Sequence, residues 1–294
     1  MFPDYSRSRL KSWLLDGAIR VDGLAQKPRD RVHGGEWVEV DIVPEAGTTA
    51  EPEPIALDVV YEDEALLVID KPPGLVVHPG AGNPSGTLMN GLLYHAEALV
   101  QLPRAGIVHR LDKDTGGLLL VGKTLASHTA LVRMMADRQI SRRYVAVCCG
   151  VLTGGGTIDA PIGRHPVDRT RMAVRTDGRP AVTHYTVRER YRAHSCVDVR
   201  LATGRTHQIR VHFAARRHPL LGDPVYGGRL ALPAGASEAL VETLRRFRRQ
   251  ALHASRLELA HPVSGEPLRF DCDVPEDFES LLEVLRQDAA CQSR

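Results

Sequence analysis

Two polar segments of the sequence carry residue types that could do acid–base or covalent chemistry. HRLDKDT at 109–115 places Asp112 and Asp114 among basic side chains and lies between two apolar runs. TGRTHQIRVH at 203–212 is rich in Arg and His. A carboxylate in such a loop can act as a general acid, a general base or a nucleophile. Arginine beside it can bind phosphate or form a bidentate pair with the carboxylate.

Both segments need a rigid sheet to hold them. The first is flanked by predicted strands at 106–109 and 118–124, and a helix is predicted at about 125–138 because its apolar residues share one face. Further apolar runs predict three strands and one helix, at 142–152, 181–191, 195–204 and about 237–250. Because strands and helices do not alternate regularly, the sequence favours an α+β fold with a mixed or largely antiparallel sheet.

The N-terminal part of the chain reads as a separate module. Residues 1–43 predict a short helix through Leu15, followed by strands at 19–23 and 34–43. Residues 44–56 are rich in Pro, Ala, Glu and Thr and show no periodicity, which is typical of a linker. We therefore expect a module at 1–43, a linker at 44–56 and a large domain at 57–294.

Charge is distributed unevenly along the chain. The 294 residues have a formal net charge of only +2, but residues 101–250 contain 26 Lys and Arg against 11 Asp and Glu. The two flanks are acidic. A basic middle that contains both polar segments indicates a surface that faces a polyanion.

Several classes of protein are disfavoured by the sequence. No apolar run approaches the roughly 18 residues of a membrane span, so we expect a cytoplasmic protein without a membrane partner. The five cysteines show no CxxC spacing, and His207 and His212 are five residues apart, which fits no common ligand spacing. Neither a metal nor another cofactor is expected.

Three ordered motifs carry a resemblance to a known family. GIVHRLDKDT, RRYVAV and LATGRTHQIRVH resemble the three motifs of the RluA family of pseudouridine synthases, and SRSRLKSWLLDGAIRVDG at 6–23 resembles an S4 RNA-binding module. The resemblance implies the pseudouridine synthase fold, with a central mixed or antiparallel sheet flanked by helices. The S4-like α/β module would lack its first helix, because Met1 stands almost at the second.

The resemblance also implies a reaction, the conversion of uridine in RNA to its C5-linked isomer without cofactor or metal. Asp112 aligns with the catalytic aspartate, which would attack the sugar C1′ or remove a sugar proton. Both routes remain open. Tyr144 aligns with the tyrosine that packs on the target base, and Arg205 with the basic partner of the aspartate.

Other residues are expected to contact RNA. Arg110 would fill the gap left by a flipped uridine, or contact a phosphate. His109 and His207 are expected to be structural or to contact RNA, with proton transfer as a minor alternative. The S4-like module would bind RNA through basic residues of its helix and first strand, which are Arg7, Arg9, Lys11 and Arg20.

By resemblance, the partner is 23S rRNA or a pre-50S particle, the target is the helix 69 stem-loop, and the enzyme is a monomer. Another rRNA site or tRNA is an alternative target. A non-catalytic RNA-binding ribosome-assembly factor is an alternative function. A glycoside hydrolase using Asp112 and Asp114 is disfavoured, because two residues that close on one loop cannot flank a bond from opposite sides.

Overall fold

The computed structural model describes residues 7–40, 50–80 and 82–291, and it divides the chain into two compact units, Met1–Thr49 and Ala50–Arg294. The division corrects the C-terminal limit of the expected linker. Residues 50–56 belong to the second unit, where the Glu53 N–H donates to the Asn90 carbonyl over 3.1 Å and Ala50 packs against the core. Residues 44–49 lie outside the described residues.

The first unit pairs one helix with a small sheet. Helix α1 (Arg7–Leu15) precedes strands β1 (Ile19–Val21), β2 (Leu24–Ala25) and β3 (Val38–Val40), which form an antiparallel sheet in the order β2-β1-β3. Trp13 and Ile19 are buried, and Gly17 takes a positive φ of 75° just after α1 ends. The predicted strand at 34–43 is shorter within the described residues, where β3 begins at Val38. The expectation that the module lacks its first helix concerns the start of the chain, and residues 1–6 lie outside the described residues.

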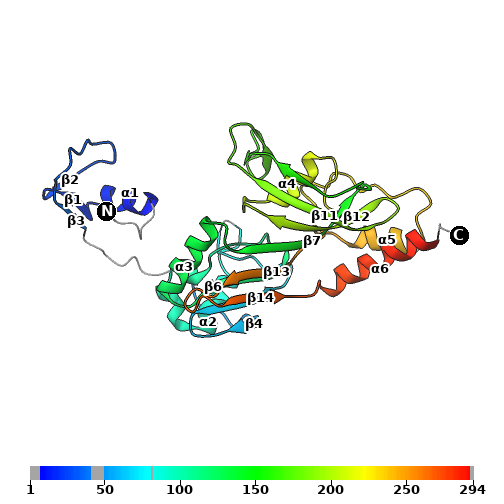
Figure 1. Ribbon diagram of the computed structural model, residues 1–294, viewed down its shortest axis with the longest axis horizontal. Coiled ribbons are helices and arrows are strands. Elements are labelled where there is room, and N and C mark those ends of the chain that lie inside the picture. Colours follow the sequence, from blue (N-terminus) through cyan, green and yellow to red (C-terminus); the bar gives the residue numbers. More distant parts are fainter. Residues whose placement is uncertain (1–6, 41–49, 81, 292–294) are drawn as a thin grey trace. The chain divides into compact units, whose positions relative to one another are not determined.

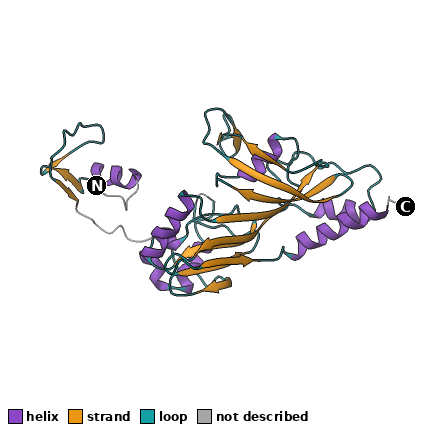
Figure 2. Cartoon of the chain, viewed as in Figure 1, coloured by secondary structure: helices purple, strands orange, loops and turns teal. Residues whose placement is uncertain are grey.

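The second unit is built on a large sheet (Figures 1 and 2). Its strands are β4 (Asp58–Glu62), β5 (Leu66–Lys71), β6 (Gly116–Gly122), β7 (Ser141–Cys149), β8 (Gly156–Asp159), β9 (Ile162–Arg164), β10 (Met172–Val174), β11 (Val182–Arg190), β12 (His194–Leu201), β13 (Leu252–Ala260) and β14 (Pro267–Asp271). Its helices are α2 (Leu88–His95), α3 (Leu125–Ala136), α4 (Gln208–Ala215), α5 (Glu238–Arg246) and α6 (Glu276–Cys291), with 3₁₀ turns η1 (Glu97–Gln101) and η2 (Pro103–Gly106).

The sheet is mixed, as expected. Its strand order is β4-β5-β6-β13-β7-β12-β11-β8, with β14 on β13 and with β9 and β10 forming a separate hairpin. The pairing of β13 with β6 is parallel, whereas the other pairings of this sheet are antiparallel. Gly117 permits the parallel pairing, because its φ is +112° and an added Cβ would lie 2.3 Å from the Ala254 carbonyl oxygen. These features confirm the predicted α+β class.

Helices cover both faces of the sheet. On one face, α2 and α4 pack against side chains such as Leu119, Ala146 and Val197. On the other face, α3 covers β5 and β6, whereas α5 and α6 cover β7 around Val145 and Val147. Alternate residues of β7 therefore enter different cores, as strand geometry requires. The loop before β6 and the turn before α4 end up on the same side of the sheet.

One expected element differs from the structure, and one helix was not expected from the sequence. The predicted strand at 106–109 reduces to a bridge between Ile107 and Val121, preceded by η2. Helix α4 forms within the second polar segment, although its buried face includes Gln208, Arg210 and His212. Polar residues on that buried face hide the apolar periodicity from which a helix is predicted.

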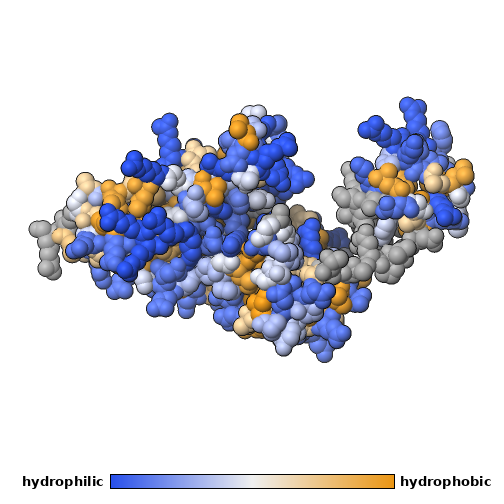
Figure 3. All heavy atoms as spheres, turned by 180° about the vertical axis from the view of Figure 1, so that it is seen from behind, coloured by the Kyte–Doolittle hydropathy of each residue, from blue (hydrophilic) through white to orange (hydrophobic). Residues whose placement is uncertain are grey.

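Figure 3 shows one face of the molecule, on which hydrophilic residues dominate and apolar residues form small groups. No helix within the described ranges is both long enough and apolar enough to cross a membrane.

Candidate active site

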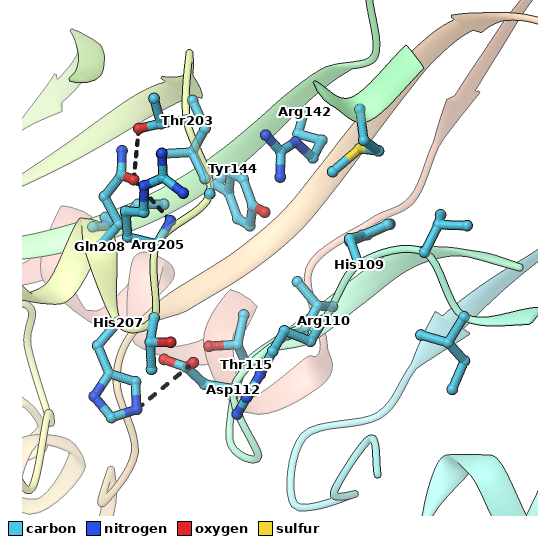
Figure 4. A pocket seen from close by; sticks show the side chains of 18 of the residues that line it. His109, Arg110, Asp112, Thr115, Arg142, Tyr144, Thr203, Arg205, His207 and Gln208 are labelled. Carbon is cyan, nitrogen blue, oxygen red and sulfur yellow. Dashed lines mark hydrogen bonds and ion pairs between the residues drawn. The ribbon is translucent and has the colours of Figure 1, made fainter. Parts of the chain in front are cut away.

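A pocket of about 490 Å³ lies where three segments of the second unit meet. They are the loop at 107–112 before β6, the start of β7 and the turn at 201–210 that leads into α4. Figure 4 shows Asp112 and His207 facing each other, with Tyr144 and Arg142 on the part of the wall that β7 provides. The structure thus brings together the two polar segments that the sequence singled out.

Asp112 is oriented by a short ion pair. Arg210 Nη1 donates to Asp112 Oδ2 over 2.9 Å, and the Asp112 side chain keeps 17% of its surface exposed. The Thr115 N–H donates to the Asp112 carbonyl over 3.1 Å, which closes the loop. The carboxylate is therefore fixed at one oxygen, while Oδ1 faces His207 and the pocket.

A second carboxylate holds Arg210 from behind. Arg210 Nε and Nη2 donate to the two oxygens of Asp223 over 2.7 and 2.9 Å, and the Asp223 side chain is fully buried. The backbone N–H groups of Val225 and Tyr226 also donate to Asp223. Burial favours the neutral form of Arg210, but the two carboxylates outweigh it and raise the pKa of Arg210 above its ordinary value. The guanidinium is charged and held in place before any substrate binds.

Tyr226 connects this arginine to His207. Its ring centroid lies 5.1 Å from the Arg210 guanidinium carbon, and its hydroxyl accepts the Met172 N–H and is hydrogen-bonded to His207 Nδ1 over 2.8 Å. His207 Nε2 lies 3.9 Å from Asp112 Oδ1. Burial lowers the pKa of His207, and the Asp112 charge offsets this only in part, so the imidazole is neutral near pH 7. His207 also has a left-handed backbone, with φ 56°, at the start of α4.

Arg205 is not the partner of Asp112, so the sequence-based pairing was wrong. Its Nε donates to the Pro180 carbonyl over 3.1 Å, while Arg210 occupies the position beside Asp112. The Arg205 backbone N–H donates to Gln208 Oε1 over 3.0 Å, which holds the turn in shape. Arg205 lines the pocket from the side opposite to Asp112 (Figure 4).

Tyr144 and Arg142 form the wall of the pocket that β7 provides. Tyr144 is buried, and burial raises the pKa of its hydroxyl, which is therefore protonated at neutral pH. Arg142 is also buried, and its Nε has no hydrogen-bond partner among the described residues. An added Cβ on Gly204 would lie 2.7 Å from Arg142 Nη1, so the glycine leaves room for this cation. An uncompensated buried donor at a pocket wall is suited to bind a substrate oxygen.

The remaining expected site residues occupy different surroundings. His109 Nε2 accepts the Leu120 N–H over 3.0 Å, and burial lowers its pKa to about 3, so this histidine is neutral and ties the loop to β6. Arg110 is exposed and lines the pocket. Lys11 is exposed on α1, whereas the side chains of Arg7 and Arg9 lie outside the described residues.

Comparisons with known proteins agree with this geometry. The family model described as RNA pseudouridylate synthase matches residues 65–215, which contain Asp112, Tyr144 and Arg210. The chain belongs to the RNA pseudouridylate synthase family. The expected enzyme class, a pseudouridine synthase that isomerises uridine in RNA, is thereby confirmed.

Curated relatives cover nearly the whole chain. It is 57% identical over 290 residues to a protein of Xanthomonas campestris pv. campestris, a match that spans 99% of this chain and 88% of the relative. It is 56% identical over 288 residues to a protein of Pseudomonas aeruginosa, with 98% and 90% covered. Both relatives are named ribosomal large subunit pseudouridine synthase D.

A solved structure of the same family also resembles this fold. Human RNA pseudouridylate synthase domain containing 4 superimposes with a TM-score of 0.62 at 26% identity, covering 78% of this chain and 93% of the human chain. The likeness supports the expected pseudouridine synthase fold for the second unit.

Sequence reasoning missed four residues of the site, which are Arg142, Arg210, Asp223 and Tyr226. Arg210 lies in the segment it singled out, but a choice between two arginines requires the direction of α4. Asp223 and Tyr226 lie in GDPVYGG at 222–228, a segment that offers no chemical signal of its own. The sequence shows only an aspartate beside a glycine, and the burial that makes Asp223 important is visible only in the structure.

Proposed function

We propose that this enzyme isomerises uridine in 23S rRNA, with Asp112 as its catalytic carboxylate. The observation that carries the proposal is the ion-paired Asp112 at the pocket, with one oxygen held by Arg210 and the other directed inward. The names of the curated relatives support a large-subunit rRNA substrate. The helix 69 stem-loop is the target that the resemblance favours.

The reaction breaks the bond between C1′ and N1 of uridine and forms one between C1′ and C5, after which C5 loses its proton and N1 gains one. Asp112 either attacks C1′ as a nucleophile or removes a proton from the sugar. In both routes the carboxylate must keep its direction while the base turns, and Arg210 supplies that restraint. Since Arg210 is itself held by Asp223, the restraint does not depend on the substrate.

The detached uracil must stay in the pocket until it is reattached. Tyr144 offers a flat, buried ring for it, and its protonated hydroxyl can donate to a uracil oxygen. The unpaired Nε of Arg142 is a second donor on the same wall. A positively charged wall is suited to a base that carries negative charge after its glycosidic bond breaks.

RNA binding is assigned to basic residues around this pocket and to the S4-like unit. Arg110 is exposed at the pocket, where it can enter the stack in place of a flipped uridine. Lys11 and Arg20 are exposed on the first unit, and we extend the same role to Arg7 and Arg9. An enzyme with this substrate works in the cytoplasm, and we infer that it acts as a monomer.

The test is a pseudouridine map of rRNA from cells with and without the protein. We expect loss of modification within one stem-loop of 23S rRNA and unchanged signals elsewhere. Loss confined to tRNA would move the substrate to another RNA. An unchanged map, with RNA binding retained, would favour a ribosome-assembly factor.

A further inference from the structure

A second cavity contains a group of side chains that the pseudouridine synthase reaction does not use. It measures about 400 Å³ and is lined by residues of β4, β5 and β13 together with the segment after β14. It shares no lining residue with the active-site pocket. Asp70 and His253 stand on its wall, and Cys272 lies next to them.

Three ligand-bearing atoms converge here. One carboxylate oxygen of Asp70, one ring nitrogen of His253 and the sulfur of Cys272 all lie within 4.8 Å of one another, and His253 Nε2 is 3.1 Å from Cys272 Sγ. We propose that these three residues bind one zinc ion, with a water from the cavity as the fourth ligand.

The architecture explains why the three side chains meet. Asp70 on β5 and His253 on β13 flank β6, where they pair with Leu118 and Gly116. The third residue, Cys272, follows β14 and is held by its own N–H, which donates to the Ser255 carbonyl over 3.0 Å. Two of the three ligands therefore lie on strands of the sheet, and the third is tied to β13 through Ser255.

The donor set favours zinc over other divalent ions. Thiolate sulfur, imidazole nitrogen and carboxylate oxygen are its usual ligands, and three protein ligands plus water is a common arrangement. Calcium and magnesium require oxygen ligands. With bonds of about 2.0–2.3 Å, tetrahedral ligands lie about 3.3–3.8 Å apart, so small side-chain rotations bring the triad to that geometry.

The surrounding charges suit a cation. Asp58 and Asp273 line the same cavity. Arg249, whose charge adds to burial in lowering the pKa of His253, is ion-paired with Asp277 at 2.7 Å. Lys71, which lines the cavity, donates its ammonium protons to three backbone carbonyls, of Pro72, Leu75 and Lys113, at 2.8–3.0 Å. Its ammonium group is thus held by the backbone.

Of the three ligands, His253 is already in the form that binds a metal ion, whereas the Cys272 thiol must lose its proton. Burial lowers the pKa of His253 to about 4, so its ring is neutral near pH 7 and has a free lone pair. Burial raises the pKa of the Cys272 thiol and of Asp70. Zinc binding forms a Zn–S bond and breaks the S–H bond, and the proton passes to solvent. The bound dication then compensates the buried negative charges.

The sequence did not suggest this site, and the expectation was that no metal binds. The ligands are separated by 183 and 19 residues, so the sequence contains no short spacing that would indicate a metal site. Zinc at this position would join β5, β13 and the segment that leads into α6. This cross-link is independent of the RNA substrate.

The experiment uses the full chain, stripped with a chelator and titrated with Co²⁺ and then with Zn²⁺. We expect a single equivalent of Co²⁺ to produce the near-ultraviolet thiolate-to-cobalt absorption band. Zinc should abolish the band, release about one proton per ion and raise the melting temperature. Absence of the band in the wild-type protein would overturn the proposal and leave a hydrogen-bonded triad.

Variants identify the ligands. Cys272→Ala is expected to lose the band entirely, and His253→Gln to weaken zinc binding at least about 10-fold. Cys291→Ala is the matched control, because this cysteine lies at the exposed end of α6, and it should keep the band. A band that survives in Cys272→Ala would contradict the assignment even if His253→Gln were unstable.

Discussion

At the scale of single residues, the site depends on the direction of one guanidinium. Arg205 and Arg210 stand five positions apart in the same segment, yet only Arg210 reaches Asp112. Arg210 is the third residue of α4, and helical side chains lean toward the helix N-terminus, where Asp112 lies. Arg205 precedes the left-handed turn at His207 and points to the Pro180 carbonyl instead.

Lysine substitutions distinguish the roles of Arg205 and Arg210. Arg210→Lys should lower kcat by about 10²-fold or more, because one ammonium cannot bind Asp112 and Asp223 with the same fork of donors. Arg205→Lys is the matched control and should change kcat by less than about 10-fold, since it loses only a bond to a carbonyl. Single-turnover pseudouridine formation on a stem-loop RNA measures both. Equal losses, or a larger loss for Arg205→Lys, would reverse the assignment.

At the scale of elements, the turn between α4 and α5 positions the catalytic loop from a distance. Residues 222–227 place Asp223 beneath Arg210 and Tyr226 beside His207. Gly222 has a φ of +72°, and an added Cβ would lie 2.2 Å from the Arg249 carbonyl oxygen, so the turn packs too closely for a side chain. The turn therefore positions Arg210, and Arg210 in turn positions Asp112.

Asp223→Asn tests whether the turn positions Asp112 through Arg210. Removing one charge of a buried pair is expected to cost about 3–5 kcal/mol of unfolding free energy. The folded variant should show a lower kcat with little change in KM, because RNA binding does not use this residue. Asp177→Asn, an exposed partner of Arg175, is the control and should leave both kcat and the urea midpoint unchanged. A kcat at the wild-type level in folded Asp223→Asn would remove its positioning role.

The junction of β6 with β13 depends on a glycine in the same way. Gly117→Ala should destabilise the protein by more than about 2 kcal/mol, because the added Cβ would meet the Ala254 backbone and the φ is positive. Gly154→Ala is the control, since nothing lies within 4 Å of its added Cβ. Urea unfolding measures both. A wild-type midpoint for Gly117→Ala would mean that the parallel pairing tolerates a side chain.

At the scale of the whole molecule, buried histidines make stability depend on pH. Burial lowers the pKa of His109 to about 3 and of His194 to about 4. In the unfolded chain these groups titrate near 6.5. Below that pH the unfolded state binds more protons, so stability is full above pH 6.5 and is lost as the pH falls toward 4.

The share of this pH dependence that comes from one histidine can be measured. His194 should contribute a loss of about 1.4 kcal/mol of unfolding free energy per pH unit between pH 6.5 and 4. His194→Gln should therefore show a shallower decline than the wild-type protein. Urea midpoints across this pH range are the measurement. Parallel curves for the two proteins would show that His194 is not buried in its neutral form.

Much of this molecule can be predicted from its sequence, and the exceptions share one cause. Strands such as β7 and β12 can be predicted from their apolar runs, and the ordered motifs place Asp112 and Tyr144 in one site. Helix α4 does not, because it buries Arg210 and His212. The partner of Asp112 and the Asp70, His253 and Cys272 triad depend on which distant side chains burial brings together. Such pairings leave no local pattern.

The central claim is that Asp112 carries the isomerisation, and one comparison tests it directly. Cells that lack the protein are supplied with wild type, Asp112→Asn or Asp114→Asn, and pseudouridine in 23S rRNA is mapped. We expect Asp114→Asn to restore the modification and Asp112→Asn to restore none, although both substitutions remove one negative charge from the same loop. Modification restored by Asp112→Asn would contradict the account, and loss with both variants would mean that the loop, rather than this carboxylate, is what the reaction requires.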